Sequence, residues 1–143
     1  MTIKNLFFAE PLLVEVLRTG VPALKSVETW RELPETITDV GPGPSAYIVF
    51  EGTGSPDNAG SATLMHQFWT VALPMRKGQT RVGQAEQQAV AGELLGEIHG
   101  VLQGLKLPGC KKLELHDGPA VRYYPGGQAV FYMTYALHCP LLT

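Results

Sequence analysis

The chain has 143 residues, the size of a typical single domain with one hydrophobic core. Its composition, 45% hydrophobic and 17% charged with a formal net charge of −2, excludes a disordered chain and a dedicated nucleic-acid-binding protein. The sequence has no apolar run of membrane-spanning length and no secretion-signal pattern at its start, so we expect no membrane partner. We expect a single domain over residues 1–143.

The first expected element is a helix that begins between Phe7 and Glu10 and ends near Gly20. Pro11 is acceptable only in its first turn, and Pro22 prevents its continuation. Its apolar face consists of Ala9, Leu13, Val16 and Leu17.

Three strands are expected next. Residues 24–30 are rich in residues that favour extended backbone, and residues 45–51 have a continuous apolar centre. Residues 63–73 form a long strand that Pro74 closes. The polar, glycine-rich residues 52–60 are expected to form the loop of an extended hairpin, and loops of this length are usually functional or mobile.

A long amphipathic helix is expected over residues 84–105, closed by Pro108 and Gly109. Its apolar positions recur with three-and-four spacing: Ala91, Leu94, Leu95, Ile98, Val101, Leu102 and Leu105.

The last third predicts further strands. Residues 110–116 alternate polar and apolar side chains, Asp117–Gly118 is expected to turn the chain, and residues 121–124 form a short extended piece. Residues 128–139 form the last strand. One face carries Ala129, Phe131, Met133, Tyr135 and Leu137, and the other carries Val130, Tyr132, Thr134, Ala136 and His138. The order α-β-β-β-α-β-β predicts an α+β fold, an antiparallel sheet of about four to five strands with two helices packed on one face.

Charge is distributed unevenly along the chain. Residues 26–60 are acidic, with Glu28, Glu32, Glu35, Asp39, Glu51 and Asp57 against Arg31. Residues 75–112 are basic, with Arg76, Lys77, Arg81, Lys106, Lys111 and Lys112 against Glu86, Glu93 and Glu97. Solvated faces without a partner explain this asymmetry, and so does contact between the acidic edge of one copy and the basic edge of another.

The candidate metal ligands are His66, His99, His116 and His138. None is paired at helical spacing or accompanied by a carboxylate cluster, so we expect no metal and no cofactor. If the two long strands pair, His66 and His138 become neighbours.

No catalytic residue is expected. Cys110 and Cys139 fit neither a metal motif nor a disulfide framework and are interpreted as free thiols in a reducing compartment. His138 cannot activate Cys139, because neighbours on a strand point to opposite faces. The sequence has no G-x-S-x-G elbow and no phosphate-binding loop.

Five aromatic residues on the two long strands raise the possibility of a stacking platform for single-stranded nucleic acid: Phe68, Trp69, Phe131, Tyr132 and Tyr135. These strands contain no Lys or Arg, so a core position is favoured and no sequence-specific nucleic acid is expected.

Three stretches carry a resemblance to a known family: residues 65–73 (MHQFWTVAL), the helix end 102–105 (LQGL) and residues 123–127 (YYPGG). Together with the order of elements, they are similar to the tail terminator (tail-completion) proteins of long-tailed bacteriophages and prophages. The resemblance implies a structural, non-enzymatic protein that forms a ring, typically of six copies. The ring caps the tail tube and offers a surface to the head connector. Its expected partners are other copies of itself, the tail-tube protein and the connector, and its expected location is the virion tail, or the host bacterial cytoplasm during assembly.

Charge and position suggest which residues meet in such a ring. The basic side of the subunit interface is expected at Arg76, Lys77 and Arg81, and the acidic side at Glu28, Glu32 and Glu35. The tube-contacting loop is expected to contain Gly52, Gly54, Asp57 and Asn58.

Two alternatives remain at this point. One is another neck or tail subunit of the same fold. The other is a small hydrolase whose site assembles from His66, His138 and an acid such as Asp117.

Overall fold

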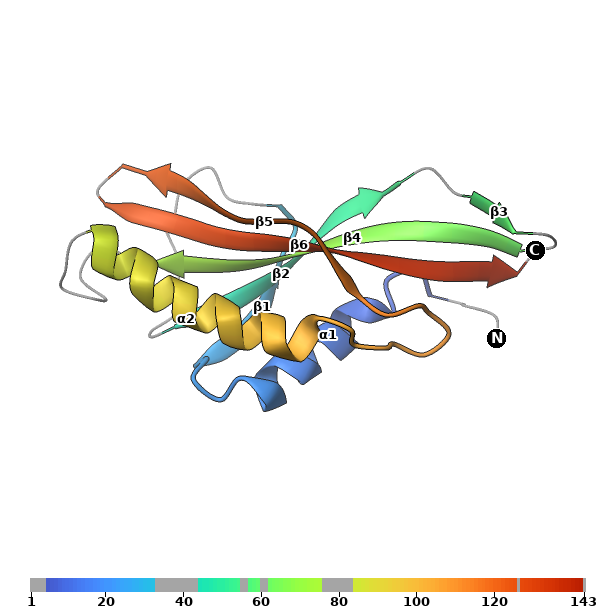
Figure 1. Cartoon of the computed structure of the whole chain (residues 1–143), viewed down its shortest axis with the longest axis horizontal. Helices are drawn as coiled ribbons and strands as arrows, with labels where there is room; N and C mark the ends of the chain where they lie inside the picture. The colour runs from blue at the N-terminus through green and yellow to red at the C-terminus, as the bar shows by residue number, and fades with distance from the viewer. Residues whose placement is uncertain are drawn as a thin grey trace.

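A mixed sheet with two helices on one face forms the frame of the molecule (Figure 1). The computed structural model describes residues 5–32, 44–54, 57–59, 62–75, 84–125 and 127–142. The elements are α1 (Ala9–Gly20), β1 (Ser26–Trp30), β2 (Ser45–Thr53), β3 (Asp57–Ala59), β4 (Ala62–Met75), α2 (Gln84–Leu102), β5 (Glu114–Tyr124) and β6 (Gln128–Leu142). The strands lie in the order β1-β2-β4-β6-β5, and the short β3 pairs with the start of β4.

The predicted α+β class and order of elements are confirmed, with one difference in strand direction. All neighbouring strands are antiparallel except β1 and β2, which run parallel. A parallel pair needs a crossover of roughly a dozen residues, and the sequence between β1 and β2, residues 31–44, is long enough to provide it. Because such a segment can equally close a hairpin, its sequence did not reveal the direction of β1.

The core lies between the sheet and the two helices. α1 packs on β1 and β2, and α2 packs on β4 and β6. The face of β6 that carries Ala129, Phe131, Met133, Tyr135 and Leu137 is buried in this core. Of the five strand aromatics, Trp69, Phe131 and Tyr135 are buried there, which confirms the core interpretation for them, whereas Phe68 and Tyr132 are only partly buried.

Pro74 does not close β4, which continues to Met75. β2 pairs with β4 from Gln67 to Ala72, so beyond Ala72 the described neighbour of β4 is β6 alone. A proline has no N–H to donate and is tolerated where one side of a strand is unpaired. The expectation failed because the sequence of β4 does not show that β2 stops pairing with it at Ala72 and so leaves Pro74 with one unpaired side.

The turn expected at Asp117–Gly118 is also wrong, since residues 114–124 form one strand, β5. β5 uses two more residues than β6 over the same register, and the surplus is absorbed by shifts between Leu115 and Asp117 and between Asp117 and Ala120. Gly118 has φ of 95°, and a Cβ there would lie 2.8 Å from the Tyr132 carbonyl oxygen. A bulge therefore explains the Asp-Gly pair that resembled a hairpin turn.

The long helix ends at Leu102, three residues before the predicted end, and residues 110–113 are not part of a long strand. Within the described residues, no helix is both long and apolar enough to cross a membrane.

Candidate assembly surfaces

A short hairpin, called here the lysine turn, connects α2 to β5 and comprises residues 105–113. Leu113 donates its backbone N–H to the carbonyl of Leu105 at 2.7 Å, and Lys106 and Lys112 form an isolated β-bridge. At the tip, the N–H of Cys110 donates to the carbonyl of Leu107 at 3.1 Å. Pro108 and Gly109 occupy the two central positions, and the φ of 75° at Gly109 is what a type II turn requires there.

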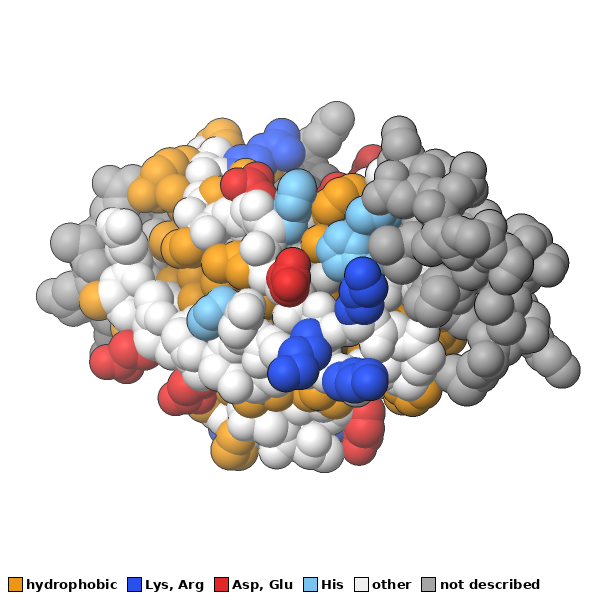
Figure 2. Space-filling view, turned by 45° about the vertical axis from the view of Figure 1, so that its right-hand side comes forward, with side chains coloured by type: hydrophobic (Ala, Val, Ile, Leu, Met, Phe, Trp, Pro, Cys, Tyr) orange, Lys and Arg blue, Asp and Glu red, His pale blue; other side chains and the backbone are white. Residues whose placement is uncertain are grey.

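The lysine turn concentrates positive charge on one surface. Lys106, Lys111 and Lys112 are all exposed, while Leu107 and Leu113 between them are buried. The backbone N–H of Lys111 donates to the carbonyl of His138 at 3.0 Å, which fixes the turn against β6. Figure 2 shows basic side chains gathered on this face below histidine side chains. The apolar anchors thus hold three lysines toward solvent.

The acidic surface lies at the β1 edge of the sheet. Glu28 and Glu32 are exposed, with Arg31 between them in the chain. A hollow of about 500 Å³ adjoins this edge, lined by Phe7, Glu10, Thr29, Trp30, Arg31 and Phe50. The acidic edge therefore borders a recess of mixed polar and aromatic character.

Exposed apolar side chains stand beside the same hollow. Phe7 is 52% exposed, yet its ring contacts Phe50 edge-on with centroids 5.1 Å apart. Phe50 lies 5.1 Å from the buried Trp69. The buried Gln67 accepts from the Trp69 indole N–H at 3.0 Å and donates to the carbonyl of Leu6. This relay holds the segment before α1 on the core, so its apolar side chains are presented in a defined position.

Two of the six predicted interface residues lie in the described part of the chain. Glu28 and Glu32 lie together on the acidic edge, whereas Arg76, Lys77, Arg81 and Glu35 fall outside the described residues. The sequence interpretation counted the lysines of the lysine turn but did not single them out. The Pro-Gly pair at 108–109 was taken only as the end of the long helix, although it also signals a tight turn.

The predicted tube-contacting loop is more ordered than expected. β2 extends through Gly52 to Thr53, with Gly52 at a register shift against β4. The N–H of Gly54 donates to the carbonyl of His66 at 2.8 Å. Asp57 and Asn58 belong to β3, which pairs with the start of β4. In Figure 1 this strand lies at the end of the molecule where β4 begins and β6 finishes.

The expected contact between two histidines is confirmed. His66 and His138 are directly opposite on β4 and β6, with ring centroids 4.3 Å apart. Asp117, the acid of the hydrolase alternative, pairs instead with Thr134. His138 lies four positions after Thr134 on β6, which is about 13 Å along the strand. Within the described ranges, no three His, Cys, Asp or Glu side chains are grouped closely enough to hold a metal ion.

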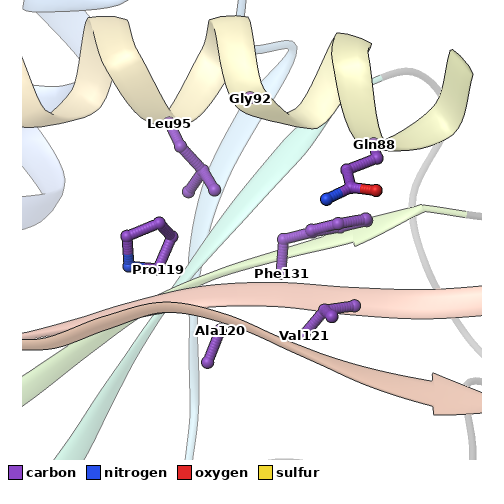
Figure 3. Close-up of a pocket in the computed structure, with 7 residues that line it drawn as sticks. All are labelled: Gln88, Gly92, Leu95, Pro119, Ala120, Val121 and Phe131. Carbon is purple, nitrogen blue, oxygen red and sulfur yellow. The ribbon is translucent and has the colours of Figure 1, made fainter. Parts of the chain in front are cut away.

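A small groove between α2 and the sheet has no reactive groups. Its volume is about 160 Å³, and its lining consists of Gln88, Gly92, Leu95, Pro119, Ala120, Val121 and Phe131. Figure 3 shows Leu95 and Gln88 directed from α2 toward Pro119 and Phe131. None of these side chains is a nucleophile, a general base or a charged group, so the groove can accept apolar surface but cannot perform acid–base chemistry.

Comparison with known proteins shows the family of the chain that carries these surfaces. The family model described as "Phage tail terminator protein" matches residues 3–141. The chain belongs to the phage tail terminator family. It is therefore a structural protein of the phage tail, as the sequence resemblance implied, and the family is a non-enzymatic one.

The fold of this tail terminator protein also occurs in a solved structure. A chain from the virion of a native gene transfer agent particle matches with a TM-score of 0.50 and 10% sequence identity, over 93% of this chain and 87% of that one. At this identity the similarity establishes the shared fold. The comparison with curated proteins finds no match.

Proposed function

We propose that this tail terminator protein assembles head-to-tail into a ring of six copies, which caps the tail tube and presents a surface to the head connector. Assembly would proceed in the host cytoplasm, and the finished ring would remain in the virion tail. The observation that carries the proposal is the position of opposite charges on opposite sides of the sheet.

β1 and β5 are the two edges of the sheet. The acidic residues Glu28 and Glu32 are at the β1 edge, and the lysine turn leads directly into β5. A surface on one side of a subunit that complements a different surface on the other side produces a head-to-tail contact, which closes into a ring when the rotation is suitable. An interface between two copies of the same surface would instead place like charges together.

We assign the basic side of the interface to Arg76, Lys77 and Arg81 together with the lysine turn, and the acidic side to Glu28, Glu32 and Glu35. The end of the molecule that carries β3 is assigned to the tail tube, through Gly52, Gly54, Asp57 and Asn58. This assignment is supported by the position of β3 at the far end of the two long strands (Figure 1).

Charge reversal tests the interface. In sedimentation velocity at low and high salt, E28K/E32K and R76E/K77E should each weaken self-association, most strongly at low salt because exposed charges are screened within about 10 Å at 0.1 M. Combining both pairs in one chain should restore association, since the charges are then exchanged rather than removed.

The matched control is E93K/E97K, which changes the net charge as much as E28K/E32K does and alters two exposed residues of α2. Sedimentation equal to wild type in both interface variants, or equal weakening in the α2 control, would rule out the proposed charge-complementary ring.

A further inference from the structure

The two cysteines of the chain lie against each other in the core. Their sulfur atoms are 3.1 Å apart, and the side chains of Cys110 and Cys139 are 5% and 0% exposed. Twenty-eight residues separate them in the sequence, and no spacing motif connects them.

Backbone contacts on both sides determine this meeting. Cys110 is the last residue of the tight turn at the tip of the lysine turn, and Cys139 is on the inner face of β6, opposite Met65 of β4. The next residue in one segment, Lys111, donates its N–H to the carbonyl of His138, the preceding residue in the other. The two sulfurs are thus positioned by a neighbouring hydrogen bond and by the packing of the core.

We propose that Cys110 and Cys139 are a modification site, at which a low-molecular-weight disulfide such as oxidised glutathione converts the two thiols into an intrachain disulfide. The Cys110 thiolate attacks one sulfur of the small disulfide and releases one thiol. Cys139 then loses its proton and attacks the Cys110 sulfur, which releases the second thiol. The protein loses two protons and two electrons, and the small disulfide takes them up and is reduced to two thiols.

The geometry requires little rearrangement. A disulfide bond is about 2.05 Å long, so the sulfurs need to approach by about one ångström. Cys110 is the first to react, because it is 5% exposed and is flanked by the exposed Gly109 and Lys111, whereas Cys139 is 0% exposed.

Burial controls the rate. It raises the pKa of both thiols. The hydrogen bond between them raises the pKa of Cys139 further and partly offsets the rise at Cys110. Since the thiolate is the reacting form, oxidation is slow at neutral pH and becomes faster as the pH rises.

The bond would fasten the lysine turn to the end of β6. In the reduced protein the turn is held there by the Lys111–His138 hydrogen bond and the buried Leu107. In the oxidised protein the turn could no longer open away from the sheet, and the three lysines would be fixed in place. This inference does not depend on whether the chain forms a ring.

The test starts with reduced, full-length protein incubated with oxidised glutathione. The protein is then unfolded in N-ethylmaleimide, and its intact mass is measured. We expect one species that is lighter than the reduced protein by two hydrogen atoms and carries no maleimide. Hydrogen exchange of the Lys111 amide should slow on oxidation and return on treatment with dithiothreitol.

Single variants test the order of attack. C139S should accumulate a glutathione adduct on Cys110, whereas C110S should react far more slowly at Cys139, with circular dichroism showing that both remain folded. Two maleimide adducts on the wild type after oxidation, a stable glutathione adduct on the wild type, or a disulfide between chains would each overturn the proposal. The wild-type mass alone decides the matter if a variant does not fold.

Discussion

Tyr135 shows how a single buried residue couples the sheet to α2. Its hydroxyl lies 2.9 Å from Nδ1 of His99, and the side chain is almost completely enclosed. Burial raises the pKa of Tyr135 to about 12, because the phenolate would lose its hydration in the core. The folded state therefore favours the neutral phenol.

This shift predicts a loss of stability at alkaline pH. The unfolded phenol ionises near pH 10, so the contribution of Tyr135 is fully present below about pH 10 and is lost as the pH rises toward about 12, at up to about 1.4 kcal/mol per pH unit. Urea unfolding of wild type and Y135F across this range measures it. The free-energy difference between the two proteins should change with pH in this window and be constant below it; parallel curves would refute the assignment.

A second prediction concerns two glycines, one with a backbone atom close to an added Cβ and one with open space there. G118A places a Cβ 2.8 Å from a backbone oxygen at a positive φ, so it should lower the free energy of unfolding by about 2 kcal/mol or more. G96A lies within α2 with no atom within 4 Å of the added Cβ, so it should raise that free energy by up to about 1 kcal/mol. Urea denaturation compares both with wild type, and equal effects would contradict the described bulge.

At the scale of elements, a buried amide fastens the first half of α2. Gln87 is 4% exposed, and its Nε2 donates to the carbonyls of Met75 and Gly127, each at 3.2 Å. One side chain thus joins the start of α2 to the end of β4 and to the residue before β6. The helix is aligned across the sheet by these bonds as well as by its apolar face.

Q87A should therefore destabilise the fold by about 1–3 kcal/mol, because the carbonyl of the buried Met75 and the carbonyl of Gly127 lose their donor. The matched control is Q88A, the same substitution at the next residue of α2, which is exposed and where we expect little change. Urea denaturation followed by circular dichroism gives both values. Equal losses in the two variants would show that the amide does not fasten the helix.

Some features of the helices and strands could be predicted from the sequence pattern, and others could not. Periodicity located both helices and the long strands, because each buries one face and its spacing records that face. The pattern did not reveal that β4 passes Pro74, that β5 absorbs a bulge at Gly118, or that residues 105–113 form a hairpin. Each of these depends on where a neighbouring strand begins or ends, and that information lies elsewhere in the chain.

At the scale of the whole molecule, the sheet separates two oppositely charged surfaces. The acidic residues of β1 and the lysine turn next to β5 lie at its two edges. Copies in register around an axis would bring one surface against the other. β3 lies at the end of the molecule where β4 begins and β6 finishes, the end that we assign to the tail tube (Figure 1).

The proposed role predicts a phenotype for the assembled particle. Tails produced without this protein should be longer than wild-type tails in electron micrographs, since nothing would stop growth of the tube. E28K/E32K should produce the same overlong tails, and the exchanged-charge chain that also carries R76E/K77E should return them to normal length. Tails of normal length in its absence would instead indicate another neck or tail subunit.

The sequence by itself determined the class of fold, the order of elements and the family, because apolar spacing and short stretches of similar sequence can be recognised in the linear chain. It also indicated that charge is divided between two regions. Only the tertiary structure decided that the two long strands pair, as the His66–His138 contact required, that Cys110 meets Cys139, and that the lysine turn packs against β6. Strand order and register bring together residues far apart in the chain, and no local pattern encodes that pairing.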